Sequence, residues 1–155
     1  TPEEARTWVR DKPWSFLRVS MPKIELPPDT DPYAPEVYAR AAENMGRLLS
    51  DGILRRDPGN HYYIYRAELD GHIQTGVVLG ASIMAYETGR IRKHETTQPA
   101  KETDRVHQIE AVGAHTGPVM MFHRANSVIA QVIAETTVAE PDTDVTVKGV
   151  GHHTV

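Results

Sequence analysis

The segment HYYIYRAEL-DG-HIQTGVVLGASI, residues 61–83, restricts the fold more than any other part of this chain. β-Branched and aromatic residues stand on both sides of Asp70-Gly71, a pair typical of two-residue turns with positive φ. Such a turn makes its two strands run antiparallel, so the sequence predicts a β-hairpin here. Gly76 and Gly80 indicate a bulge or a close backbone approach on the second strand.

Helical and strand-like patterns are mixed along the rest of the chain. From apolar spacing and capping residues, helices are expected over 1–11, 35–50, 100–112 and 125–136. Short strands are expected over 14–20 and 117–122, and a second hairpin over 143–155. Residues 87–95 are expected to turn at Thr88-Gly89 and continue as a short strand or an extended loop. The mixture predicts an α+β fold, with a mixed, largely antiparallel sheet and packed helices.

Several helix ends can be predicted from single residues. Thr1 is the expected N-cap of the first helix, and Gly52 is the expected stop of the second. Asp31-Pro32 is expected to cap the second helix, and Asn126 or Ser127 the last one. The prolines of 21–35 predict a surface connection without regular structure.

Composition sets the class of protein. A chain of 155 residues, 39% hydrophobic and 25% charged, predicts one domain with a real core. The net charge of −4 does not give the basic field that nucleic-acid binding needs, so nucleic acid is an improbable partner. The absence of Cys excludes disulfides and thiolate chemistry and favours a reducing, cytoplasmic location. No apolar run approaches the length of about 20 residues needed to span a bilayer.

The most informative segment for function runs from Arg92 to Arg105. A strand that leads through a loop into a helix offers unpaired N–H groups and a positive dipole end to a phosphate. Lys101 and Arg105, four residues apart, would share one face of that helix. The remaining polar groups of the expected site are Arg92, Lys93 and His94 on the strand side, with Thr96 and Thr97 in the loop. Glu95 would act as a base or as a magnesium ligand among these cations.

A simpler interpretation is also open. Lys101, Glu102, Asp104 and Arg105 could form the salt-bridged, exposed face of an ordinary helix. That interpretation leaves the upstream cluster RKHE, residues 92–95, without a role.

Metal and nucleic-acid motifs are weak. HETTQ lacks the second His of the zinc-protease signature, and His152-His153 would point to opposite faces of a strand. His107, His115 and His123 have no spacing that indicates ligation, so no metal site is expected. Tyr62, Tyr63 and Tyr65 are expected to be packing residues of a strand rather than a base-stacking surface.

The segment RKHETTQPAKETDR, followed by AHTGPV, resembles the signature K-H-E-x-T-x-P-x-K-E-x-D-R and then N-T-G-P of domain-of-unknown-function family 1015. The matching residues are Lys93, His94, Glu95, Thr97, Pro99, Lys101, Glu102, Asp104, Arg105, Thr116, Gly117 and Pro118. The segments PWSFLRVSMPKIELPP and VYARAAENMGRLLSDGIL also resemble that family, so the resemblance covers nearly the whole chain. Gln98 and His115 depart from it, standing where the family commonly has Arg and Asn.

The resemblance implies a ParB/RepB-like protein with a ParB/sulfiredoxin-like fold, of which this chain would be the N-terminal part. Free-serine kinases share that fold, and genes of the family often lie beside serine-biosynthesis genes. The resemblance therefore implies a phosphotransferase that uses ATP or ADP with Mg²⁺ and acts on serine, phosphoserine or a similar metabolite.

In that mechanism Lys93, Lys101 and Arg105 would hold phosphates, Glu95 would take the proton, and His94 would orient Glu95. Thr116 and Gly117 would add contacts from a second loop. Two alternatives remain: a ParB-like, nucleotide-dependent DNA-binding module, and a non-catalytic sensor of a phosphorylated metabolite. The oligomeric state is not predicted.

Overall fold

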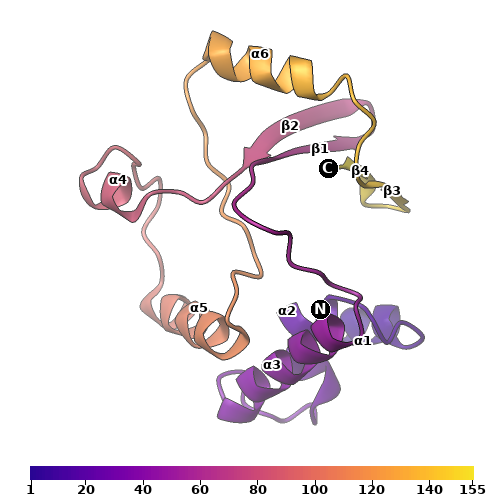
Figure 1. Cartoon of the computed structure of the whole chain (residues 1–155). Helices are drawn as coiled ribbons and strands as arrows, with labels where there is room; N and C mark the ends of the chain where they lie inside the picture. Colours follow the sequence, from indigo (N-terminus) through magenta and orange to yellow (C-terminus); the bar gives the residue numbers. More distant parts are fainter. The chain divides into compact units, whose positions relative to one another are not determined.

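The computed structural model describes all residues from 1 to 155. They group into two compact units, of which the first comprises Thr1–Arg56 and Lys93–Met120. The second unit comprises Asp57–Arg92 and Met121–Val155. The first unit is helical and the second contains the sheet (Figure 1), so the α+β class predicted from the sequence is confirmed.

The first unit contains five helical elements. They are α1 (Pro2–Val9), α2 (Leu17–Ser20), the 3-10 helix η1 (Pro22–Glu25), α3 (Pro35–Ser50) and α5 (Pro99–Val112). The Thr1 side chain accepts from the Glu4 N–H, which confirms Thr1 as the N-cap of α1. Helix α3 has Pro at N1 and ends before Gly52, whose φ of 71° confirms the predicted stop.

The core of the first unit is formed by α3 and the N-terminal helices. One side of α3 buries Val37, Tyr38, Ala41 and Leu48. Each large apolar side chain buried in this way contributes about 1.5–3 kcal/mol relative to exposure. Ala5, Val9 and Ile24 form a neighbouring cluster. The apolar residues at helical spacing in 35–50 therefore form the face of α3 that packs.

The strand predicted over 14–20 is wrong, because this segment contains α2. The Arg18 guanidinium donates to the carbonyl oxygens of Val9 (2.7 Å) and Lys12 (3.2 Å), and Val19 is fully buried. These tertiary contacts outweigh the β propensity of the segment.

The connection over 21–35 is more ordered than its prolines predict. Pro22 and Ile24 are buried in η1. The Arg6 guanidinium donates to three backbone carbonyl oxygens, those of Lys23, Ile24 and Leu26, at 3.1–3.4 Å. The predicted cap at Asp31 is also wrong, since Ala34 is the N-cap of α3 and Asp31 accepts from the Tyr33 N–H instead.

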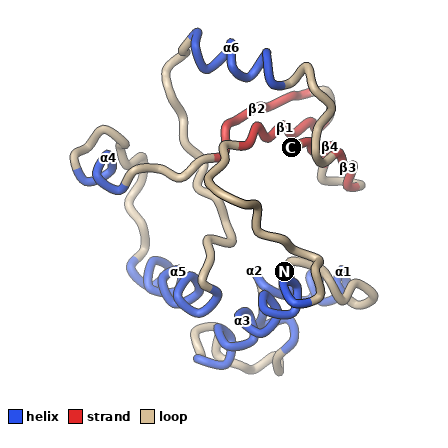
Figure 2. The backbone as a smooth tube through the Cα atoms, in the orientation of Figure 1, coloured by secondary structure: helices blue, strands red, loops and turns tan.

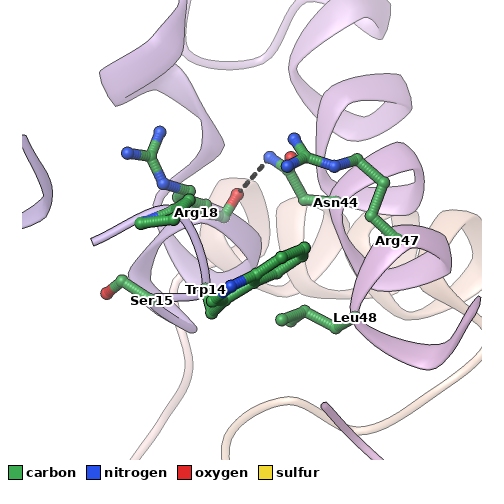
Figure 3. Close-up of a pocket in the computed structure, with 7 residues that line it drawn as sticks. Trp14, Ser15, Arg18, Asn44, Arg47 and Leu48 are labelled. Atoms are coloured by element: carbon green, nitrogen blue, oxygen red, sulfur yellow. Dashed lines mark hydrogen bonds between the residues drawn. The ribbon is translucent and has the colours of Figure 1, made fainter. Parts of the chain in front are cut away.

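A buried polar network ties α3 to the helices before it. Asn44 is 4% exposed, and its amide donates to the Arg18 carbonyl oxygen (2.9 Å) and to the Glu25 carboxylate (2.6 Å). Arg18 forms an ion pair with the same Glu25 carboxylate. Figure 3 shows Asn44 directed at Arg18, with Trp14 and Arg47 beside them.

The second unit is built on a four-stranded sheet with the order β2-β1-β4-β3. Its strands are β1 (Tyr63–Leu69), β2 (His72–Val78), β3 (Asp144–Val147) and β4 (Gly151–Thr154). Every pairing is antiparallel, so the sheet contains no parallel pair and is not mixed. Both hairpins are confirmed, and Asp70 and Gly71 have φ values of 52° and 78° as the turn requires.

The bulge expected on β2 is absent. The pairing of β1 with β2 is continuous from Tyr63 opposite Val78 to Leu69 opposite His72. A Cβ atom added at Gly76 or Gly80 would meet nothing within 4 Å, so no close backbone approach explains these glycines either.

Two helices complete the second unit, α4 (Ile83–Glu87) and α6 (Ser127–Thr136). The Asn126 side chain accepts from the N–H groups of Val128 and Ile129, which confirms the predicted cap of α6. The strand predicted over 117–122 is wrong, since this segment is loop (Figure 2). No neighbouring strand pairs with it, and Val119 and Phe122 are more than 80% exposed.

Candidate functional site

Helix α5 carries the centre of the predicted site. It begins at Pro99, one residue before the predicted start, and its N-cap residue Gln98 makes no side-chain capping bond. The Lys101 and Glu102 N–H groups both donate to the Gln98 carbonyl oxygen. The Thr97 hydroxyl donates to the Glu102 carboxylate at 2.9 Å, which fixes the loop against the first turns of the helix.

Helix α5 packs against α3 through polar side chains. It also contacts α2: Gln108 is 2% exposed, and its amide donates to the carbonyl oxygen of Val19 on α2 at 3.0 Å. Val106, which shares the predicted apolar side with Ile109 and Val112, is instead 46% exposed. Ile109 and Val112 are half-buried, so the apolar side predicted from the spacing of 106, 109 and 112 is only partly the side of α5 that packs.

The contact between α3 and α5 contains a chain of three polar side chains. The Tyr38 hydroxyl on α3 donates to Oδ1 of Asp104 on α5 at 3.0 Å. Nε and Nη2 of Arg105 donate to Oδ2 of the same carboxylate, at 3.1 and 2.6 Å. Burial, the hydrogen bond to Asp104 and the charge of Asp104 raise the pKa of the Tyr38 hydroxyl above its usual value of 10.0. The Tyr38 ring also meets the His107 ring edge-on, with 5.4 Å between centroids.

Lys101 and Arg105 lie one turn apart on the exposed surface of α5, as the sequence predicts. The Arg105 side chain is 58% exposed, whereas the Asp104 side chain is 20% exposed. Because Asp104 occupies Nε and Nη2, the Nη1 group of Arg105 has no protein partner. The alternative of a salt-bridged face is only partly present, since Arg105 pairs with the adjacent Asp104 and not at helical spacing.

The residues before α5 are an exposed loop. Arg92, Lys93, His94 and Glu95 lie in no strand, so the loop form of the prediction holds and the strand form is wrong. Arg92 belongs to the second unit, whereas the other three belong to the first. No hydrogen bond or ion pair holds the His94 ring or the Glu95 carboxylate.

Thr116 and Gly117 follow the other end of α5. The helix stops at Gly113, whose φ of 69° is the left-handed conformation common after a helix. Fourteen helical residues span about 20 Å at 1.5 Å per residue, and this length separates the two ends of α5. No hydrogen bond joins Thr116 or Gly117 to Lys101 or Arg105.

Hollows and side-chain clusters elsewhere in the molecule are less suited to a phosphate. An open hollow of about 470 Å³ along α6 has a mainly apolar lining that includes Ile129, Ala130 and Ile133. The hollow in Figure 3, between Trp14 and Arg47, has a volume of about 10 Å³, enough for one water molecule and too small for a nucleotide. Nowhere do three or more His, Asp or Glu side chains gather as a metal ion would require. His152 binds Asp144 at 2.7 Å, and His153 binds the Tyr65 hydroxyl at 2.7 Å, so the two rings have separate partners.

Tyr38 is the residue of this region that sequence reasoning missed. The spacing of 35–50 assigned it only to the packed side of a helix. A usable signal was present, because a buried phenol needs a hydrogen-bond partner and the charged segment supplies carboxylates. Which carboxylate it would find could not be read from the sequence.

No helix of the structure combines the length and the apolar character needed to cross a membrane.

Comparison with known proteins gives one positive result, a match to a protein family. No curated protein and no solved structure matches the chain. The model of the family described as "Protein of unknown function (DUF1015)" matches residues 1–155. The match covers the whole chain, as expected from the three segments that resemble the family. The chain therefore belongs to that family.

Proposed function

We propose that the N-terminal half of α5 binds the phosphate groups of a phosphorylated small molecule or a nucleotide. The observation that carries the proposal is the pair Lys101 and Arg105, which project one turn apart from an exposed helix surface. Two cations at this spacing can contact one phosphate or two adjacent ones. The start of α5 lacks a side-chain cap, so its positive dipole end adds to the attraction.

Arg105 suits this role better than an ordinary surface cation. Its carboxylate partner uses one edge of the guanidinium and leaves Nη1 available to a ligand. Arginine binds phosphate through a planar fork of donors, so a guanidinium of fixed orientation is an advantage. The Thr97 hydroxyl is held close to the first turns of α5 by its hydrogen bond to Glu102.

Phosphoryl transfer is the reaction we propose for this site, with serine or phosphoserine as the substrate class and ATP or ADP with Mg²⁺ as the donor or acceptor. The reaction asks mainly for positioning and charge neutralisation, which Lys101 and Arg105 can provide. In this proposal Glu95 takes the proton of the attacking hydroxyl, and His94 orients the Glu95 carboxylate. Glu95 is exposed and unpaired, so its carboxylate is chemically available.

A non-catalytic sensor is the second candidate, and one observation favours it. Asp104 is the carboxylate in contact with Arg105, and it is engaged by both Tyr38 and Arg105. A carboxylate held in this way is a poor general base. The net charge of −4 gives a DNA-binding module no comparable support.

Thermal unfolding with and without ligands tests the binding. The ligands are ATP, ADP, inorganic pyrophosphate and phosphoserine, each with and without Mg²⁺. A ligand at 100 times its dissociation constant adds about 2.7 kcal/mol, which raises the melting temperature of a chain of this length by about 5–10 °C.

Lys101→Ala and Arg105→Ala should abolish most of this shift, whereas Arg55→Ala, an exposed cation in a loop of the same unit, should keep it. Equal shifts in all three variants would refute the proposal. Serine-dependent formation of ADP or phosphoserine that is lost in Glu95→Gln separates a phosphotransferase from a sensor.

A further inference from the structure

The contact between α3 and α5 contains groups that the binding of phosphate by Lys101 and Arg105 does not itself require. Tyr38 is 7% exposed, and its hydroxyl is committed to Asp104. Asp104 in turn uses its second oxygen for Nε and Nη2 of Arg105. A buried residue on one helix is thus connected through a single carboxylate, that of Asp104, to an exposed cation on another.

We propose that Tyr38 and Asp104 are positioning residues that set the orientation of the Arg105 guanidinium for an incoming phosphate. The inference rests on the proposed phosphate site and names what organises it. A free arginine side chain has many rotamers, and fixing one of them on binding costs conformational entropy. When Asp104 holds Arg105 before the ligand arrives, part of that cost is already met by the fold.

Tyr38 is needed because Asp104 alone would not be fixed. The Asp104 carboxylate is 20% exposed and could rotate about its own side-chain bonds to follow Arg105. The Tyr38 ring, which α3 carries, is held in place because it is buried and because it meets the His107 ring edge-on. The hydroxyl of this immobile ring holds Oδ1, so Oδ2 keeps a constant position for Arg105.

The negative charge of Asp104 also supports a role for Tyr38 and Asp104 in orienting Arg105. Asp104 as an anion accepts from both partners, and hydrogen bonds to a charged group are stronger than neutral ones. An added phosphate competes with Asp104 for the guanidinium only if it approaches the occupied edge. Approach at Nη1 lets the ligand and Asp104 share Arg105, which keeps the supporting contact intact.

A double-mutant cycle tests the inference. Inorganic pyrophosphate is the probe, and its dissociation constant is measured by titration calorimetry for the wild type, Tyr38→Phe, Arg105→Ala and the double variant. Tyr38→Phe keeps the ring and removes only the hydroxyl, and we expect it to weaken binding about three- to tenfold. In the Arg105→Ala background the same change should have no further effect, because Tyr38 acts through Arg105. Tyr62→Phe, which removes a hydroxyl from a tyrosine that is 79% exposed, is the control and should bind as the wild type does.

The outcomes are separable. If Tyr38→Phe weakens binding by the same factor in both backgrounds, Tyr38 has only a structural role and the inference is wrong. If Tyr38→Phe binds as tightly as the wild type while Arg105→Ala does not, the phosphate site stands and the inference fails. If pyrophosphate does not bind to the wild type, or binds to Arg105→Ala and Lys101→Ala as tightly as to the wild type, the proposed function fails as well. Should Tyr38→Phe lose its helical circular dichroism, Asp104→Asn replaces it in the cycle with the same expectations.

Discussion

Gly151 begins β4 and lies beside the backbone of Glu68 on β1, and its replacement gives a sharp test of the sheet. Its φ of 133° is a conformation that residues with a side chain rarely adopt. A Cβ atom there would lie 2.6 Å from the Glu68 carbonyl oxygen. The obstacle is backbone, so relief requires β4 to move away from β1 by several tenths of an ångström. Gly151→Ala should therefore weaken the pairing of β1 with β4.

The magnitude follows from the strain. A side chain held at such a φ costs about 1–3 kcal/mol, and the close contact with Glu68 adds to this. We expect a loss of about 2–3 kcal/mol in local stability, which corresponds to roughly 30- to 150-fold faster amide exchange. The measurement is hydrogen exchange of the backbone amides in the three residue pairs that join 66–68 of β1 to 152–154 of β4.

Gly76→Ala is the matched control. Gly76 also lies within a strand, but its φ is not positive and an added Cβ would meet nothing within 4 Å. This variant should keep the exchange rates of the wild type within about a factor of five, or slow them slightly through a less flexible unfolded chain. If Gly151→Ala exchanges like Gly76→Ala, the argument from φ and contact distance is refuted.

Two further predictions concern the first unit. Asn44→Ala should destabilise it by about 2–4 kcal/mol, because the Arg18 carbonyl and the Glu25 carboxylate both lose a donor in a buried place. Tyr38→Phe should cost about 1–2 kcal/mol at neutral pH through the lost bond to Asp104. The raised pKa of Tyr38 means that its contribution is fully present below about pH 10 and is lost as the pH rises through the folded-state value, so the two proteins should converge in strong alkali.

Both predictions can be followed by tryptophan fluorescence in urea, because Trp8 and Trp14 lie in the first unit and the second has none. Asn60→Ala, an exposed amide in the second unit, is the control for Asn44→Ala. A change below about 0.5 kcal/mol for Asn44→Ala would contradict the importance of its two bonds. A difference between Tyr38→Phe and the wild type that stays constant to the highest pH would contradict the role of the phenol proton.

The candidate site was partly predictable. Lys101 and Arg105 could be placed on one face of a helix because helical periodicity is local and regular. The partner of Arg105 could not be chosen in advance, since Glu102 and Asp104 are both within reach along the chain. The structure selects Asp104, because the buried Tyr38 hydroxyl binds that carboxylate. The strand expected before α5 failed because no second strand lies there to pair with it.

Elements specified by neighbouring residues were determined by the sequence itself. The hairpin at Asp70-Gly71 and the helix capped by Asn126 depend on positive φ values and capping bonds within a few residues. Tertiary structure decided whatever depends on partners distant in the chain. Tyr38 and Asp104 are 66 residues apart, and Gln108 and Val19 are 89 apart. Local pattern carries no information about such pairs, because burial of a polar group is satisfied by whichever donor or acceptor the packing of the helices brings to it.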